Sequence, residues 1–195
     1  MTNNLKTLSR KARACEVCLP HLAHGVRPVF QVSANARILI AGQAPGSRVH
    51  ASGIPFDDPS GKRLRDWMGI SRETFYNPEQ VAILPMGFCY PGQGKSGDAP
   101  PRDECAPLWR EAFLSAMPAV KVQLVIGQYA QVWHLPELAK QTLTARVKRW
   151  HESPTDTIAL PHPSPRNNRW LKNNPWFDAE VLPKLRKRIK KALAA

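Results

Sequence analysis

Residues 37–46 read Arg37-Ile-Leu-Ile-Ala41 followed directly by Gly42-Gln43-Ala44-Pro45-Gly46. A short apolar run that ends at glycine and proline is typical of a buried strand that enters a tight turn. Such a turn brings backbone N–H groups close to a ligand, as phosphate-binding turns do. The stretch therefore predicts a strand whose carboxyl end opens a ligand site, although a purely structural turn would have the same pattern.

Three further apolar runs end in the same way and extend this prediction to a sheet. They are Val81-Ala-Ile-Leu84 before Pro85, Gln123-Leu-Val-Ile126 before Gly127, and Thr157-Ile-Ala-Leu160 before Pro161. Helical patterns lie between them, at 60–68 and at 104–117, the second with Leu108, Phe113 and Leu114 as its apolar residues. Alternating strands and helices favour a three-layer α/β/α fold with a mainly parallel central sheet. In such folds ligands bind at the carboxyl ends of the strands, so the turns should converge.

Length and charge limit the organisation of the chain. Its 195 residues fit one domain, 1–195. We expect residues 1–13 to be a basic N-terminal segment, with the ordered part starting at Cys15. Residues 178–195 are expected to form a basic C-terminal helix, which either docks with a solvated face or contacts DNA. The net charge of +13 favours a polyanionic partner.

Neither a signal peptide nor an apolar run long enough to cross a bilayer is present in the sequence. We therefore expect a cytoplasmic protein. In that reducing compartment, Cys15, Cys18, Cys89 and Cys105 are better candidates for metal ligands than for disulfides. Cys89 lies in a Gly/Pro-rich loop at 85–101, longer than most connections, which predicts a functional or ligand-anchored loop.

Two more motifs complete the pattern: Gly53-Ile-Pro-Phe56, continuing to Ser60-Gly61, and His162-Pro-Ser-Pro165 after the last strand. In this order, from about residue 14 to 177, the chain resembles the uracil-DNA glycosylase superfamily. The four cysteines are similar to the cluster ligands of its iron–sulfur type A and type B branches. This resemblance implies a [4Fe–4S] cluster, with a structural zinc ion and free buried thiols as the alternatives.

The resemblance also implies roles in base excision. Phe56 matches the aromatic residue that stacks on the flipped base, and His162 matches the histidine that donates to it. An ordinary core phenylalanine and a structural histidine remain the alternatives. The predicted base-binding residues are Gly42, Gln43, Ala44, Phe56, Pro85 and His162, and the predicted catalytic residues are Asp58, His162 and Gln43.

The catalytic carboxylate is where this sequence departs from its relatives. Type A enzymes carry an acid where Gln43 stands here, and the best-known uracil-DNA glycosylases carry an aspartate where Ala44 stands, whereas the type B branch also lacks both. The type B branch places an aspartate in a motif that resembles residues 56–61, which makes Asp58 the candidate for activating water or stabilising the oxocarbenium ion. Asp58 would equally suit the cap of a helix that opens near Ser60. Asp57 and His50 are possible substitutes.

Proline at position 85 is a second departure, because type A enzymes carry there an asparagine that binds the uracil edge. Proline has neither a side-chain donor nor an N–H, so we expect Gln43 or main-chain groups to bind the base, or a pocket that accepts other deaminated bases. The predicted DNA contacts are Ser164, Arg166 in the wedge position, Arg169, Lys62 and Arg63. The predicted function is a monomeric DNA-repair glycosylase acting on single- or double-stranded DNA with damaged bases. A non-catalytic base-binding protein and a nucleotide- or RNA-processing enzyme are the alternatives.

Overall fold

The structure is a computed structural model that describes residues 2–95, 97–149 and 156–194. Its centre is a sheet of four parallel strands in the order β2-β1-β5-β6. The strands are β1 (Ile38–Ala41), β2 (Val81–Ile83), β5 (Val122–Ile126) and β6 (Thr157–Leu160). They coincide with the four predicted apolar runs to within one residue. Almost every strand side chain is buried, which is why these segments lack the polar alternation of a half-exposed sheet.

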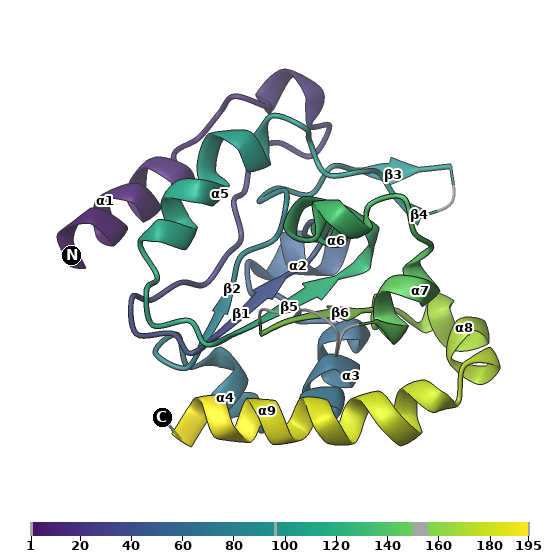
Figure 1. Cartoon of the computed structure of the whole chain (residues 1–195). Coiled ribbons are helices and arrows are strands. Elements are labelled where there is room, and N and C mark those ends of the chain that lie inside the picture. The colour runs from purple at the N-terminus through teal and green to yellow at the C-terminus, as the bar shows by residue number, and fades with distance from the viewer. Residues whose placement is uncertain (1, 96, 150–155, 195) are drawn as a thin grey trace.

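Helices cover both faces of this sheet (Figure 1), which confirms the predicted fold class. One face carries α3 (Pro59–Met68), α4 (Arg72–Tyr76) and α9 (Leu182–Ala194), and the other carries α1 (Thr2–Arg13), α5 (Cys105–Ser115) and α6 (Gly127–His134). The side chains of β1 alternate between the two cores: Ile38 and Ile40 pack with α3 and α9, whereas Leu39 packs with α1 and α5.

Shorter elements connect these layers. They are η1 (Leu19–His21), α2 (Ser47–Ser52), η2 (Pro136–Leu138), α7 (Leu143–Lys148), η4 (Pro165–Asn167), α8 (Asn168–Asn173), the π-helical turn η5 (Phe177–Val181), and a two-stranded antiparallel sheet of β3 (Gln93–Gly94) and β4 (Gly97–Asp98). The β3–β4 hairpin lies inside the long Gly/Pro-rich loop.

The N-terminal segment differs from the prediction, since order begins well before Cys15. Residues 2–13 form α1, and Leu5 and Ala12 are buried in the core that α1 shares with α5. Leu5, Leu8 and Ala12 recur at helical spacing, and burying that stripe holds the helix despite its basic outer face.

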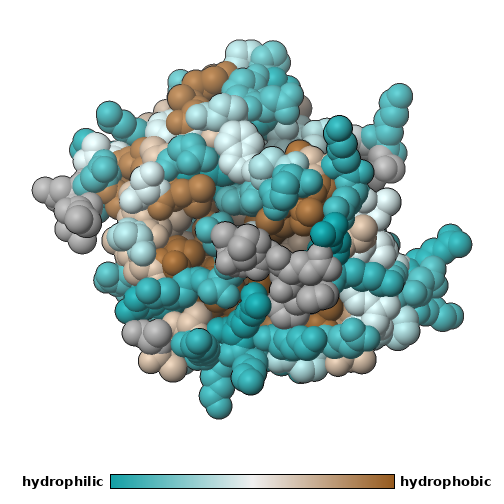
Figure 2. Space-filling view, viewed as in Figure 1, coloured by the Kyte–Doolittle hydropathy of each residue, from teal (hydrophilic) through white to brown (hydrophobic). Residues whose placement is uncertain are grey.

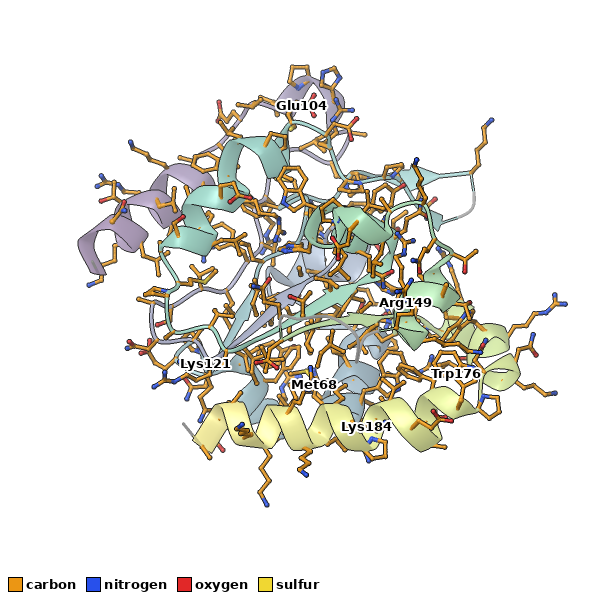
Figure 3. The ribbon with its side chains drawn as sticks, viewed as in Figure 1. Met68, Glu104, Lys121, Arg149, Trp176 and Lys184 are labelled. Carbon is orange, nitrogen blue, oxygen red and sulfur yellow. The ribbon has the colours of Figure 1, made fainter. Side chains whose placement is uncertain are left out.

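The C-terminal helix docks as expected. Leu182, Leu185 and Ile189 are buried against the core. Arg186 ties α9 to α3 by donating from Nη2 to the Asp66 carbonyl at 3.0 Å, and Met68, labelled in Figure 3, lies in the layer between the two helices. Hydrophilic side chains extend from the lower edge of the molecule in Figure 2, where Figure 1 places α9.

The buried face of α5 differs from the predicted one. On α5, Phe113 is fully buried, but Leu108 is 49% exposed and lies beside the cysteines. In the described parts of the chain, no helix is both long and apolar enough to span a membrane.

Candidate active site

A pocket opens at the carboxyl ends of β1, β2 and β6, where the predicted motifs meet. It is lined by all six predicted base-binding residues and all three predicted catalytic ones. Ser164 and Arg166 line it as well. Segments separated by more than a hundred residues in the sequence thus form one site, as the parallel sheet requires.

The turn after β1 is fixed by its backbone. The Gly42 carbonyl accepts the Met86 N–H at 2.9 Å, and the Gln43 carbonyl accepts the Gly87 N–H at 2.9 Å. The Gln43 side chain donates to the Ala99 carbonyl at 3.3 Å, which ties the pocket floor to the β3–β4 loop. Pro85 is buried in the same wall.

Phe56 is held in an unusual backbone conformation. Its φ of 55° makes it the one non-glycine residue with positive φ in the described chain. Holding an aromatic residue there costs on the order of 1 kcal/mol, and such strain is concentrated at functional sites. Gly61 permits it, because a Cβ at that position would collide with the Phe56 carbonyl. The ring lies over Gly42, where an added Cβ would come within 3.4 Å of Cζ.

Asp58 is the N-cap of α3: its Oδ1 accepts the Gly61 N–H at 2.8 Å. The capping interpretation is therefore confirmed, and the same residue also lines the pocket. The two possible substitutes lie outside the residues that line it. Asp57 faces Arg72, with 3.5 Å between Oδ1 and Nη2, and His50 packs beside Tyr90.

His162 is mostly buried, and Ser164 and Asn167 hydrogen-bond to its ring and to its carbonyl. The Ser164 N–H points at Nδ1 over 3.2 Å, which assigns Nδ1 as an acceptor and puts the proton of the neutral ring on Nε2. Asn167 donates to the His162 carbonyl at 2.7 Å. Burial lowers the pKa of His162, while the carboxylates of Asp58 and Asp98 oppose that shift. The ring is thus a neutral donor at neutral pH.

The predicted DNA contacts have different surroundings. Arg166 is exposed at the pocket mouth, with its guanidinium packed against Gly97 of the hairpin. Arg63 donates to the Ser164 carbonyl at 3.2 Å and so fixes the loop that carries His162. Lys62 forms an exposed ion pair with Asp66, and Arg169 is exposed on α8.

The pocket lining includes residues that the sequence analysis missed, such as Arg48 of α2. It also missed Gln93 and Asp98, which face each other across the β3–β4 hairpin. The signal that could have found them is the pair of glycines at 94 and 97, which bracket a tight turn between two short segments. The hairpin is too short to show any hydrophobic alternation.

The four cysteines lie around a second cavity, formed by the segment before η1, the loop after β2 and the start of α5. None of them forms a disulfide. Burial raises the pKa of Cys18, Cys89 and Cys105, that of Cys105 to about 12. The donor set suits a cluster or zinc, but nowhere in residues 2–95, 97–149 and 156–194 are three His, Cys, Asp or Glu side chains grouped as metal binding requires.

Glu104 reaches this cavity from the start of α5 (Figure 3). Its Oε1 accepts a hydrogen bond from Arg102 Nη2 at 2.6 Å, and the Cys18 sulfur lies 3.9 Å from Oε2. The thiols therefore share one site without the close approach of metal ligands.

Comparison with known proteins identifies a family for the sequence and a similar solved structure. The sequence model of the Uracil DNA glycosylase superfamily matches residues 29–186. Among solved structures, the chain is similar to a solution NMR structure from Methanosarcina acetivorans, described as a candidate uracil DNA glycosylase. The TM-score is 0.50 at 16% identity, and the match covers 83% of this chain and 98% of that one. At this identity the likeness shows the fold alone.

Proposed function

Because the chain belongs to the uracil DNA glycosylase superfamily, we propose that it is a DNA-repair glycosylase that hydrolyses the N-glycosidic bond of a deaminated base. The observation that carries the proposal is the convergence of three groups on one pocket: the 42–46 turn, the strained Phe56 and the neutral His162. Each supplies something that base excision needs.

Base flipping costs a few kcal/mol, which the pocket must offset. Stacking on Phe56 would contribute roughly 1–3 kcal/mol. Gly61 and Gly42 accommodate the ring, because a Cβ at Gly61 would collide with the Phe56 carbonyl and one at Gly42 would come within 3.4 Å of Cζ. A fixed aromatic platform loses little conformational entropy when the base arrives.

Bond cleavage leaves negative charge on the departing base. A donor placed where that charge develops stabilises the transition state more than the ground state. The Nε2–H of His162 fits this role because Nδ1 is already occupied by the Ser164 N–H. Arg166 at the pocket mouth is suited to fill the space left by the base or to hold a phosphate.

The choice of base follows from what the pocket lacks. Pro85 offers no hydrogen-bond donor, and one N–H of the Gln43 amide is engaged with the Ala99 carbonyl, which leaves its second N–H and its oxygen for bases of different hydrogen-bonding pattern. We therefore propose a pocket that accepts more than one deaminated base, such as hypoxanthine or xanthine as well as uracil. The net charge of +13 is consistent with DNA as the partner.

We also propose that Cys15, Cys18, Cys89 and Cys105 hold a [4Fe–4S] cluster, with zinc as the alternative. When bound, the group would serve as a structural link between the N-terminal segment, the long loop and α5. The shared cavity and the four-thiol donor set support this, and the thiols would have to approach one another more closely to bind it.

The test is release of free base from single- and double-stranded oligonucleotides that contain uracil, hypoxanthine or xanthine. We expect release by the wild-type protein and a loss of at least 100-fold in rate for His162→Ala, the usual scale for a lost transition-state donor. Exposed Tyr129→Ala on α6 is the matched control and should leave the rate unchanged. Wild-type protein that binds these oligonucleotides but releases nothing would favour the non-catalytic alternative.

A further inference from the structure

Asp98 reaches the pocket from β4, on the side opposite α3. Its Oδ2 lies 3.2 Å from the position that a Cβ on Gly46 would take, so the carboxylate sits directly over the turn that follows β1. It lines the same pocket as Asp58 and His162. The residue as a whole is exposed, which leaves the carboxylate open to water.

The β3–β4 hairpin is fastened at several points, so Asp98 is not on a loose loop. Gln43 binds the Ala99 carbonyl, and the Ala99 N–H donates to the Gly92 carbonyl at 2.9 Å. The Arg166 guanidinium packs against Gly97, whose φ of 123° suits glycine alone. The carboxylate is therefore held between the 42–46 turn and the loop after β6.

The two pocket carboxylates differ in what they already bind. Asp58 accepts the Gly61 N–H at the start of α3, which commits one of its oxygens to the helix. For Asp98, the described residues provide neither a hydrogen bond nor an ion pair to the carboxylate, and both of its oxygens are free to accept. Electrostatically, Asp58 and Asp98 both favour a charged His162, and Arg166 opposes them.

We propose that Asp98, rather than Asp58, is the catalytic base of the pocket, an assignment that rests on the proposed glycosylase function. Water attacks C1′ of the deoxyribose, and a C1′–O bond forms as the C1′–N bond breaks. The electron pair of the broken bond goes to the base, and the proton of the water goes to Asp98. That proton then passes to the released base through solvent, so one water is consumed per base and sugar hydroxyl formed.

The two assignments are separated by a set of isosteric variants, Asp98→Asn and Asp58→Asn. Asparagine keeps a carbonyl oxygen, so it preserves the α3 cap, but it cannot take a proton. In single-turnover release of a base that the wild type removes, we expect Asp98→Asn to lose at least 100-fold in rate, the scale of general base catalysis. Asp58→Asn should lose less than about tenfold, since its cap survives.

Asp103→Asn is the matched control, because Asp103 is exposed in the segment between β4 and α5 and does not line the pocket. Melting temperature and affinity for DNA, measured on each variant, show whether the hairpin is intact. Should Asp98→Asn melt lower than the wild type, Asp98→Ala with added sodium formate decides: recovered rate supports a base at this position, and no recovery overturns it.

Two failures remain distinct. An active wild type whose Asp98→Asn variant stays within about threefold of its rate overturns the assignment of Asp98 and leaves the glycosylase proposal standing. A wild type that releases no base from any of the three substrates overturns the proposed function itself.

Discussion

The pocket and the cysteine cavity differ in the elements that position their residues. The 42–46 turn and the His162 loop of the pocket follow directly from strands, and hydrogen bonds at the Gly42, Gln43 and His162 carbonyls fix their backbone. The cysteines lie on connecting segments and at the start of a helix. The sulfur atoms there have hydrogen-bond contacts of a different kind: Cys18 lies 3.9 Å from Glu104, and Cys105 accepts the Phe88 N–H at 3.4 Å. Cys18 also contacts Arg102, and Cys89 contacts the Arg27 backbone.

This difference indicates which region depends on a ligand for its shape. In the pocket, the sheet and backbone hydrogen bonds position the 42–46 turn and His162 without a ligand. In the cavity, burial raises the pKa of Cys89 and Cys105, and the backbone hydrogen bonds from Arg27 and Phe88 offset that rise only in part. A bound metal group would therefore add mainly to stability, and the pocket would supply the chemistry.

The largest effect that would sharpen this contrast is expected from Cys89→Ser combined with Cys105→Ser. With the proposed cluster bound in the wild type, losing two ligands should cost about 4 kcal/mol of unfolding free energy or more. For a chain of this size that lowers the melting temperature by roughly 10 °C. Iron and sulfide content, visible absorbance and thermal unfolding measure it.

Val17→Ala is the control for this prediction, because Val17 lines the same cavity without a ligand atom. It should keep the metal and most of the stability. A double variant with wild-type stability would show that the cavity holds no structural metal, and the contrast between the two regions would then fail.

A smaller effect is expected from Gly61→Ala, which tests whether the pocket is shaped by its own backbone. The new Cβ would collide with the Phe56 carbonyl, so Phe56 must leave its strained conformation. We expect about 3 kcal/mol of destabilisation, as for overpacked sites, together with slower base release. Chemical unfolding and the release assay measure the two.

Gly25→Ala separates this collision from the cost of positive φ alone. Gly25 has a φ of 74° with nothing near the added Cβ, so the change should cost only about 1 kcal/mol. Equal losses at the two positions would contradict the role given to Gly61.

The smallest expected effect is on the pH dependence of stability, and it involves Arg110 of α5 and its neighbour His134. Arg110 on this helix donates to the Leu84 carbonyl at 2.7 Å and lies 2.9 Å from His134 Nε2. Burial, and then the charge of Arg110, lower the pKa of His134 to about 3. Below the ordinary pKa near 6.5, the unfolded chain takes up a proton that the folded chain does not, so stability falls as the pH drops toward 3.

His134→Gln keeps an acceptor for Arg110 and removes this proton uptake. The unfolding free energy of the variant should fall less steeply between pH 6 and pH 4, by at most about 1.4 kcal/mol per pH unit. The partial exposure of His134 makes the real difference smaller. Denaturant unfolding at several pH values measures it, and identical slopes would refute the buried, neutral His134.

The sheet was predictable because its signal is local. Each strand is a short apolar run followed closely by glycine or proline, and burial on both faces leaves Gln123 and Thr157 as the only polar residues in these four strands. The convergence of the 42–46 turn, Phe56 and His162 followed from the parallel order and from the family resemblance. The helix at 2–13 was missed because its basic residues outnumber the few apolar ones that it buries.

The glycines at 94 and 97 could have indicated the hairpin, but they could not indicate that Asp98 would lie in the pocket. Its place in the pocket depends on contacts of Gln43 and Arg166 with the hairpin, which join segments far apart in the sequence. The exposed position of Leu108 is similar, since helical spacing alone does not reveal that one side of α5 faces the cysteine cavity. Such contacts depend on tertiary structure that no local pattern encodes.

The strand order β2-β1-β5-β6 also has a consequence for how the molecule assembles. β1 pairs with β5, placing Ile38 beside Val122, and β6 joins only at the outer edge of β5. Pairings between such distant segments form slowly, because long loops must close first. During synthesis, the His162 loop is the last of the pocket segments to emerge, so a nascent chain carries the 42–46 turn and Phe56 before the pocket can be completed. DNA recognition and final folding should therefore be acquired in the same step.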